Sequence, residues 1–270
     1  MKRLSWLFVL SLSLLLILST VGCNSQNSEQ SPEQNTPVAQ TEIMVSAAAS
    51  LQNAMTELQQ DYAQKKPDVK LTLNFGSSGK LQQQIEQGAP ADLFLSAGQS
   101  QMDALEEKNL LVKDSRINLL SNDLVIVAGK DSTKVNSLED LSEDDVEKIG
   151  LGTPESVPAG KYAKEALTSL NLWDSLNSKF VMAKDVTQVL NYVETGNVEA
   201  GFVYSSDAQG SDKVKVVMAL PESSHKPIVY PAAIISSTKN LQASQDFLNY
   251  LQGSNAKQVF AKYGFKTPAK

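Results

Sequence analysis

The feature that most constrains the fold is a regular alternation of strand-like and helix-like segments from Glu42 onward. Short apolar or alternating runs predict strands, and apolar residues at helical spacing predict helices. The predicted strands are 43–47, 69–75, 92–96, 124–128, 180–183, 200–204, 214–219 and 228–235. The predicted helices are 51–65, 81–86, 102–108, 159–170, 186–194, 242–251 and 255–263. This order predicts an α/β fold with a mostly parallel sheet, in which the apolar run 124–128 is a buried parallel strand.

The first 22 residues have the pattern of a secretory signal peptide. Lys2 and Arg3 precede an apolar run, and small residues then lead to Cys23. This placement resembles a bacterial lipobox, which implies that Cys23 is lipidated; the alternative is a plain signal peptide followed by a free cysteine. Residues 23–41 are rich in Asn, Gln, Ser and Pro, so they predict a flexible tether. The expected location is the periplasm or the outer face of the cytoplasmic membrane.

Composition excludes several classes of function. Without Lys2 and Arg3 the chain has 22 basic and 30 acidic residues, a net charge of −8, which is unsuitable for binding nucleic acid. The single Cys excludes a disulfide framework and a multi-Cys metal site. The single His, His225, excludes a zinc site made of several His residues.

Two segments of the chain repeat one pattern. In residues 78–88 and 186–196, a helix start is followed by Glu after eight residues and by Gly after ten, and a predicted strand comes next. This echo favours two similar α/β lobes, each of which contributes the same kind of helix N-terminus to a shared cleft.

Small or hydroxyl residues stand at four predicted helix starts. These are the segments 47–51, 75–79, 157–160 and 185–186. The N-terminus of a helix presents unpaired N–H groups and a positive dipole end, both of which suit an anion. Each start alone fits an ordinary N-cap. Together they predict a cage of neutral donors around an oxyanion, with Ser50 and Ser78 adding hydroxyl groups.

Seven stretches closely resemble the molybdate-binding proteins of bacterial molybdate ABC importers. They are AAASLQNAM (47–55), FGSSGKL (75–81), IEQGAPADLFLSA (85–97), VPAGKYAKEAL (157–167), DVTQVLNYVETG (185–196), GFVYSSDA (201–208) and KQVFAKYGF (257–265). The resemblance implies a two-lobed periplasmic-binding-protein fold of type II. It also implies an oxyanion held by hydroxyl and backbone donors, which by motif are Ser50, Ser78, Ala159, Val186 and Tyr204. Ser77 is the main ambiguity, because it stands beside Ser78.

The resemblance further implies the organisation of the chain and its role. Lobe 1 would comprise 42–120 plus 231–270, and lobe 2 would comprise 121–230, with crossovers near 118–122 and 229–231. The expected function is that of a monomeric receptor that captures molybdate, and tungstate with it, and delivers the ion to a membrane permease. No cofactor and no catalytic activity are expected. The alternatives are the same fold tuned to tungstate alone, sulfate or phosphate, and an enzyme such as a phosphatase or sulfatase.

Several further residues are expected to have structural roles. His225 and the acidic run 139–147 are predicted to be solvent-exposed, and Asp92 to make a hydrogen bond at a strand start. Lys80 and Lys161 follow two of the helix starts; we expect solvated side chains there, with steering of anions as the alternative.

Overall fold

The computed structural model describes residues 40–268 of the chain, so the predicted signal peptide, Cys23 and nearly all of the predicted tether lie outside the described residues. The described part contains two five-stranded sheets. The first has the order β2-β1-β3-β10-β4, with bounds Val69–Gly76, Thr41–Ala48, Leu93–Leu95, Val229–Ile234 and Ile117–Ser121. The second has the order β7-β6-β8-β5-β9, with bounds Phe180–Ala183, Ile149–Gly152, Ala200–Tyr204, Leu124–Gly129 and Val214–Ala219. The predicted two-lobed α/β fold is confirmed.

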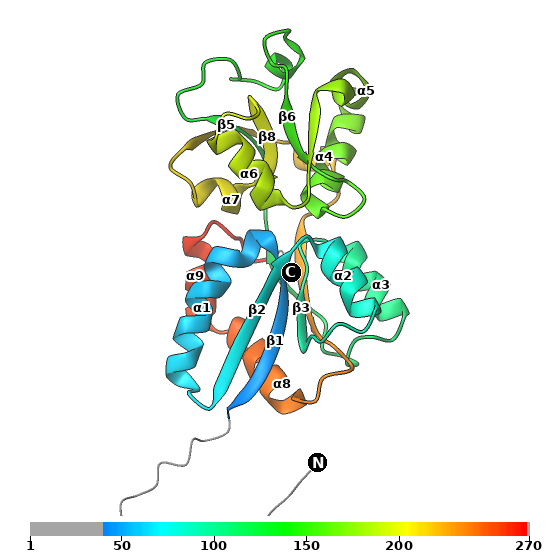
Figure 1. Ribbon diagram of the computed structural model, residues 1–270, viewed down its shortest axis with the longest axis vertical. Helices are drawn as coiled ribbons and strands as arrows, with labels where there is room; N and C mark the ends of the chain where they lie inside the picture. Colours follow the sequence, from blue (N-terminus) through cyan, green and yellow to red (C-terminus); the bar gives the residue numbers. More distant parts are fainter. Residues whose placement is uncertain (1–39, 269–270) are drawn as a thin grey trace, which may run out of the picture. The chain divides into compact units, whose positions relative to one another are not determined.

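The helices cover both sheets. Their bounds are Gln52–Lys65 (α1), Ser78–Glu86 (α2), Gln99–Glu107 (α3), Pro158–Ser169 (α4), Trp173–Leu176 (α5), Val186–Glu194 (α6), Ser205–Gln209 (α7), Leu241–Leu251 (α8) and Ser254–Lys262 (α9). On the first sheet, α1, α8 and α9 pack on one face, and α2 and α3 pack on the other (Figure 1). The core between α2, α3 and the sheet is a separate cluster that contains Leu81, Phe94 and Met102.

The prediction of a mostly parallel sheet is wrong. Each sheet has two parallel and two antiparallel strand pairs. In particular, β5 lies antiparallel to both β8 and β9. Residues Leu124–Ala128 are buried without interruption because β5 is an inner strand with covered faces, and burial on both faces produces an apolar run whatever the strand direction.

The two sheets have equivalent topologies. If β1, β2, β3, β10 and β4 are matched with β6, β7, β8, β5 and β9, both the strand order and the strand directions agree. Helix α2 joins β2 to β3 as α6 joins β7 to β8. The internal echo in the sequence therefore reflects a structural repeat.

The chain passes between the sheets twice. The first passage is at Asn122–Asp123, between β4 and β5, and the second is between β9 and β10. At the first passage Lys266 forms an ion pair with Asp123, and the backbones of Lys266 and Ser121 exchange hydrogen bonds. We retain the lobe boundaries given above as a proposal; the structure begins β1 at Thr41, one residue before the predicted start of the fold.

Candidate functional site

All five predicted ligand residues border one small cavity. Its volume is about 10 Å³, and both sheets contribute to its wall. The lining residues are Ala48, Ala49, Ser50, Gly76, Ser77, Ser78, Ala97, Val157, Pro158, Ala159, Asp185, Val186 and Tyr204. Most of them stand at or just beyond the carboxyl ends of β1, β2, β3, β7 and β8 or at the start of α4, where ligands bind in open α/β sheets.

Three helices direct their first turns toward this cavity. The first intrahelical bonds of α2, α4 and α6 are made by the N–H groups of Leu81, Lys161 and Val189. The earlier N–H groups of Ser78, Ala159 and Val186 have no acceptor within their own helices. These groups and the three helix dipoles place positive potential at the cavity without any charged side chain.

The start of α4 is held in place by a close backbone contact. A Cβ atom on Gly160 would lie 1.8 Å from the carbonyl oxygen of Gly152, at the end of β6. Only glycine permits this approach, which brings the N-terminus of α4 directly against the strand. The position of the Ala159 N–H group therefore depends on Gly160.

The hydroxyl of Ser78 is arranged as a donor. Its Oγ accepts a hydrogen bond of 2.9 Å from the N–H group of Ala97, so its own proton remains available. Among the described residues, the neighbouring Ser77 Oγ is buried and has no hydrogen-bond partner. Both serine side chains border the cavity, so the two hydroxyls are both within the candidate site.

Tyr230 packs beside Tyr204, which borders the cavity. Their rings are 5.6 Å apart in an edge-to-face arrangement, and Tyr204 Oη donates to the carbonyl oxygen of Ala97 at 3.4 Å. Tyr230 Oη lies 3.0 Å from Ser50 Oγ. Burial raises the pKa of both phenols well above the ordinary value, so both keep their protons. Tyr230 could not be predicted from the sequence, because an aromatic residue in a predicted strand has the pattern of an ordinary core residue.

The only charged side chain in the lining is engaged elsewhere. Asp185 Oδ1 accepts a hydrogen bond of 2.8 Å from the N–H group of Gln188, as the N-cap of α6. Asp92 likewise accepts hydrogen bonds from Met44 N and Thr238 Oγ1, which confirms its predicted structural role. The acidic side chains in 139–147 are exposed or half-buried around buried Leu141 and Val146.

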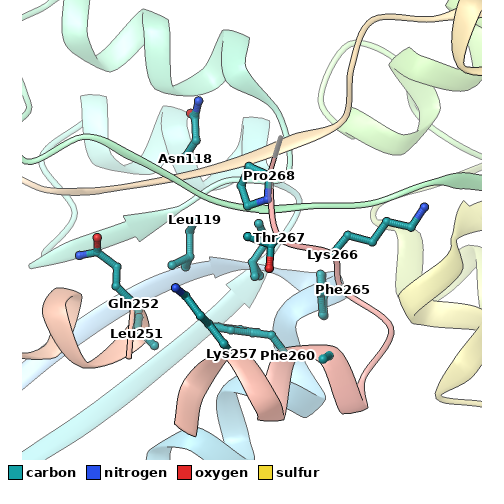
Figure 2. Close-up of a pocket in the computed structure, with 12 residues that line it drawn as sticks. Asn118, Leu119, Leu251, Gln252, Lys257, Phe260, Phe265, Lys266, Thr267 and Pro268 are labelled. Carbon is teal, nitrogen blue, oxygen red and sulfur yellow. The ribbon is translucent and has the colours of Figure 1, made fainter. Parts of the chain in front are cut away.

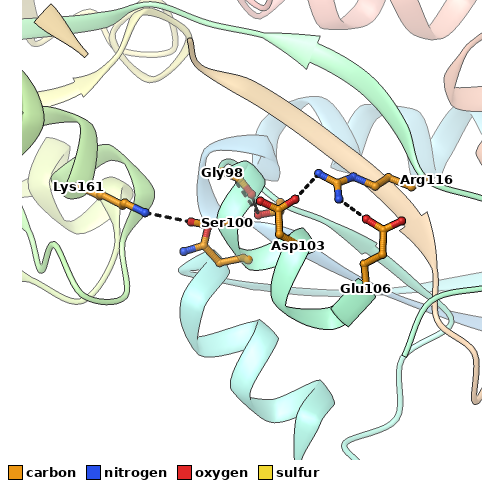
Figure 3. A network of polar contacts seen from close by, with 8 residues as sticks. Gly98, Ser100, Asp103, Glu106, Arg116 and Lys161 are labelled. Atoms are coloured by element: carbon orange, nitrogen blue, oxygen red, sulfur yellow. Dashed lines mark hydrogen bonds and ion pairs between the residues drawn. The ribbon is translucent and has the colours of Figure 1, made fainter. Parts of the chain in front are cut away.

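Neither of the two lysines lies in the lining. Lys80 is exposed, as expected. Lys161 is half-buried, and its Nζ lies 3.2 Å from Ser100 Oγ, so it links α4 to α3 (Figure 3). In the same view Arg116 forms ion pairs with Asp103 and Glu106. His225 is half-buried near Tyr162, with ring centroids 6.0 Å apart, so its predicted exposure is only partial.

The structure is closed around the cavity. The N–H group of Gly79 donates to the carbonyl oxygen of Ser156 at 3.0 Å, which joins the start of α2 to the loop before α4. Tyr204 and Lys161, which belong to the second lobe, make hydrogen bonds to Ala97 and Ser100 of the first lobe. Gln209 adds a hydrogen bond of 3.0 Å to the carbonyl oxygen of Lys262.

Two larger cavities lie away from these donors. One of about 300 Å³ is bordered by β4, the ends of α8 and α9, and the segment Phe265–Pro268 (Figure 2). Another of about 550 Å³ lies beside the two passages between the sheets. Neither wall contains the first turn of α2, α4 or α6, so neither has the convergent N–H groups of the small cavity.

Residues 40–268 contain neither a metal-binding cluster nor a membrane-spanning helix. No group of three or more His, Cys, Asp or Glu residues in this part is arranged to hold a metal ion. No helix in the same part is long and apolar enough to span a membrane.

Comparisons with known proteins agree on one family. Residues 43–266 match the family described as bacterial extracellular solute-binding protein. YvgL of Bacillus subtilis, provisionally named an ABC transporter substrate-binding lipoprotein, is 44% identical over 96% of each chain. The molybdate-binding protein ModA of Haemophilus influenzae is 42% identical over 84% of this chain and 91% of its own. A solved substrate-binding domain of a provisionally assigned molybdenum ABC transporter from Clostridium difficile is 49% identical, covers 85% of this chain and 100% of its own, and superposes with a TM-score of 0.67.

Proposed function

Because this chain belongs to the bacterial extracellular solute-binding protein family, we propose that it captures molybdate, and tungstate by the same contacts, for delivery to the permease of an ABC importer. The family membership makes the chain a non-enzymatic binding protein of an ABC transporter that acts outside the cytoplasmic membrane. The ion is its cargo, and the proposal includes no cofactor.

One observation carries the proposal: a cavity between two lobes that contact each other, lined by neutral donors from both. We propose that the oxyanion accepts hydrogen bonds from the hydroxyls of Ser50, Ser78 and Tyr204 and from the N–H groups of Ala159 and Val186. For this contact the proton of Tyr204 turns from the carbonyl oxygen of Ala97 to the ion. All five residues border the cavity. A dianion bound by both lobes stabilises the closed form over the open one, since only the closed form offers all the contacts.

The names of the relatives support the choice of ion. ModA of Haemophilus influenzae is named for molybdate, and the Clostridium difficile domain for molybdenum. Phosphate is disfavoured because its protonated form needs an acceptor, whereas the proposed contacts are donors. Sulfate is smaller than molybdate, so donors spaced for the larger ion would leave some of its hydrogen bonds too long.

We propose that the receptor acts as a monomer anchored by lipid on Cys23. The lipobox-like placement of Cys23 and the lipoprotein name of YvgL support the anchor. Expression of the chain with Cys23→Ser tests it, because the variant should move from the membrane fraction to the soluble fraction. A variant that stays in the membrane fraction as the wild type does would contradict the lipid anchor.

Calorimetric titration of the purified protein with molybdate, tungstate, sulfate and phosphate tests the proposed ligand. We expect tight binding of the first two ions and weak binding of the other two. Sulfate binding as tight as molybdate binding would reject the molybdate assignment and leave a general oxyanion receptor. Hydrolysis of phosphate or sulfate esters by the same sample, lost in a Ser78→Ala variant, would favour an enzyme instead.

A further inference from the structure

We infer that Tyr230 and Asn122 form a directed hydrogen-bond chain that holds the Ser50 hydroxyl as a donor toward the bound oxyanion. This inference rests on the proposed function and adds two positioning residues to it. Neither residue borders the ligand cavity; both lie at the passages of the chain between the sheets. Both are buried, with Tyr230 1% and Asn122 7% exposed.

Asn122 determines the direction of the hydrogen-bond chain. Its Oδ1 lies 3.0 Å from the backbone nitrogen of Asp123, and a backbone N–H group can only donate. Oδ1 also accepts from Ser205 Oγ at 2.7 Å. The oxygen of the Asn122 amide is thereby fixed on this side, and its NH₂ group must face the opposite way.

The NH₂ group of Asn122 then determines the role of Tyr230. Its two hydrogens are directed at Ser206 Oγ, at 2.8 Å, and at Tyr230 Oη, at 3.4 Å. Tyr230 Oη therefore receives a hydrogen bond and needs an acceptor for its own proton. Ser50 Oγ, which lies 3.0 Å away, accepts this proton in the proposed arrangement.

Ser50 is the last member of the chain. Because its oxygen accepts from Tyr230, its own proton points away from Tyr230, toward the ligand cavity that Ser50 borders. Successive bonds in such a chain polarise one another, so Ser50 becomes a better donor to an anion than an isolated serine. Ser78 receives a similar bond from the fixed N–H group of Ala97. Each serine hydroxyl is thus turned toward the cavity by a hydrogen bond that its oxygen accepts. For Ser78 the bond comes from a backbone N–H group, whereas for Ser50 it comes from a side chain.

The hydrogen-bond chain also connects the candidate site to the two places where the polypeptide crosses between the lobes. Asn122 lies between β4 and β5, Tyr230 is the second residue of β10, and Ser205 and Ser206 directly follow Tyr204. An opening motion that separates Asn122 from Tyr230 would release the proton of Tyr230 from its fixed direction. Ser50 is then a fixed donor only in the closed form.

A double-mutant cycle on the full chain tests the inference, with molybdate, tungstate and sulfate as probes in calorimetric titrations. Ser50→Ala removes the donor, and Tyr230→Phe removes only the hydroxyl that orients it. We expect Tyr230→Phe alone to weaken molybdate binding about threefold to tenfold, as part of one hydrogen bond to a charged group. In the Ser50→Ala background the same change should alter affinity by less than about twofold, because the group that it orients is gone.

Tyr62→Phe is the matched control. Its ring is equally buried in the first lobe, and its hydroxyl has no hydrogen-bond partner among the described residues. It should leave affinity unchanged in both backgrounds. If Tyr230→Phe does not fold, Asn122→Asp replaces it: the carboxylate would accept the proton of Tyr230 and turn it away from Ser50. The loss of molybdate affinity caused by Asn122→Asp should be smaller in the Ser50→Ala background.

The outcomes separate the inference from the proposed function. Equal effects of Tyr230→Phe in the two backgrounds would show a merely structural role and overturn the inference, while molybdate binding by the wild type still supports the proposed function. Tight binding of sulfate instead of molybdate rejects the proposed ion, and the cycle is then read with sulfate. A wild-type chain that binds none of the three ions overturns both.

Discussion

A Gly79→Ala substitution, which places a methyl group between the lobes, should weaken closure of the lobes without weakening their folding. Gly79 is the second residue of α2, and a Cβ atom there would lie 2.6 Å from the carbonyl oxygen of Ser156 and 2.8 Å from its Cα. Both neighbouring atoms belong to backbone, which cannot turn aside as a side chain can. Gly79→Ala should therefore keep the start of α2 and the loop before α4 apart.

The size of the effect follows from these distances. Ordinary contact begins at 3.4 Å, so the two segments must separate by about 0.8 Å. The hydrogen bond from Gly79 N to Ser156 O, now 3.0 Å, would then exceed the usual limit. Bonds from Ala159 and Val186 to a ligand seated on Ser50 and Ser78 would lengthen to a similar degree. Loss of one bond to a charged group costs about 1.5–3 kcal/mol, which is about a tenfold to hundredfold loss of affinity.

Stability without ligand should change in the opposite sense. Alanine is favoured over glycine in helices by about 0.5–1 kcal/mol, so the open, unliganded form should unfold at an equal or higher temperature. Calorimetric titration with molybdate and thermal unfolding without ligand measure the two effects. Gly129→Ala is the control, because its Cβ would meet only Ser132 Cβ, at 3.9 Å. Wild-type affinity in Gly79→Ala would refute the argument that the observed closure is the binding form.

Three further predictions follow from the same contacts. Ser50→Ala and Ser78→Ala should each weaken molybdate binding about tenfold to a hundredfold in titrations, whereas Lys80→Ala should change it little; the reverse pattern would contradict a neutral cage. Molybdate at saturation should reduce the radius of gyration in small-angle scattering, and unchanged dimensions would count against closure. Burial raises the pKa of Asp207 to about 7, above the value of about 3.9 in unfolded chains. The folded protein then holds a proton that the unfolded chain releases, so the free energy of unfolding should fall by up to about 4 kcal/mol between pH 4 and 7. Urea unfolding at several pH values measures this slope, which Asp207→Asn should flatten; a rise in stability over the same range would contradict it.

The sequence predicted the elements with strong periodicity and missed short ones. Helix α6 and strand β8 have the predicted bounds. Strand β6, Ile149–Gly152, is four residues long and half glycine, so it has no β pattern of its own. Helix α7, with the sequence SSDAQ, has a single apolar residue and no helical period to detect. Tertiary contacts define both elements, and local sequence cannot reveal them.

In the candidate site too, features with a local sequence pattern were predicted, and features that depend on long-range contacts were not. The helix starts at Ser78, Ala159 and Val186 are visible in sequence because small residues, or Asp185 as an N-cap, precede helical patterns. The contacts of Ser50 with Tyr230 and of Ser78 with Ala97 depend on the pairing of distant strands. No spacing rule connects positions 50 and 230, so the hydrogen bonds that orient the predicted donors could be identified only from the structure.

The placement of β10 determines the order in which this protein can assemble. Strands β5 to β9 form their sheet from one continuous stretch, 124–219, so the second lobe can fold from contiguous chain. In the first lobe β10 stands between β3 and β4, so that sheet stays divided until Val229–Ile234 has been synthesised. Contacts between segments so far apart in the chain close slowly. During synthesis, the lobe whose residues emerge first is therefore the lobe that is completed last.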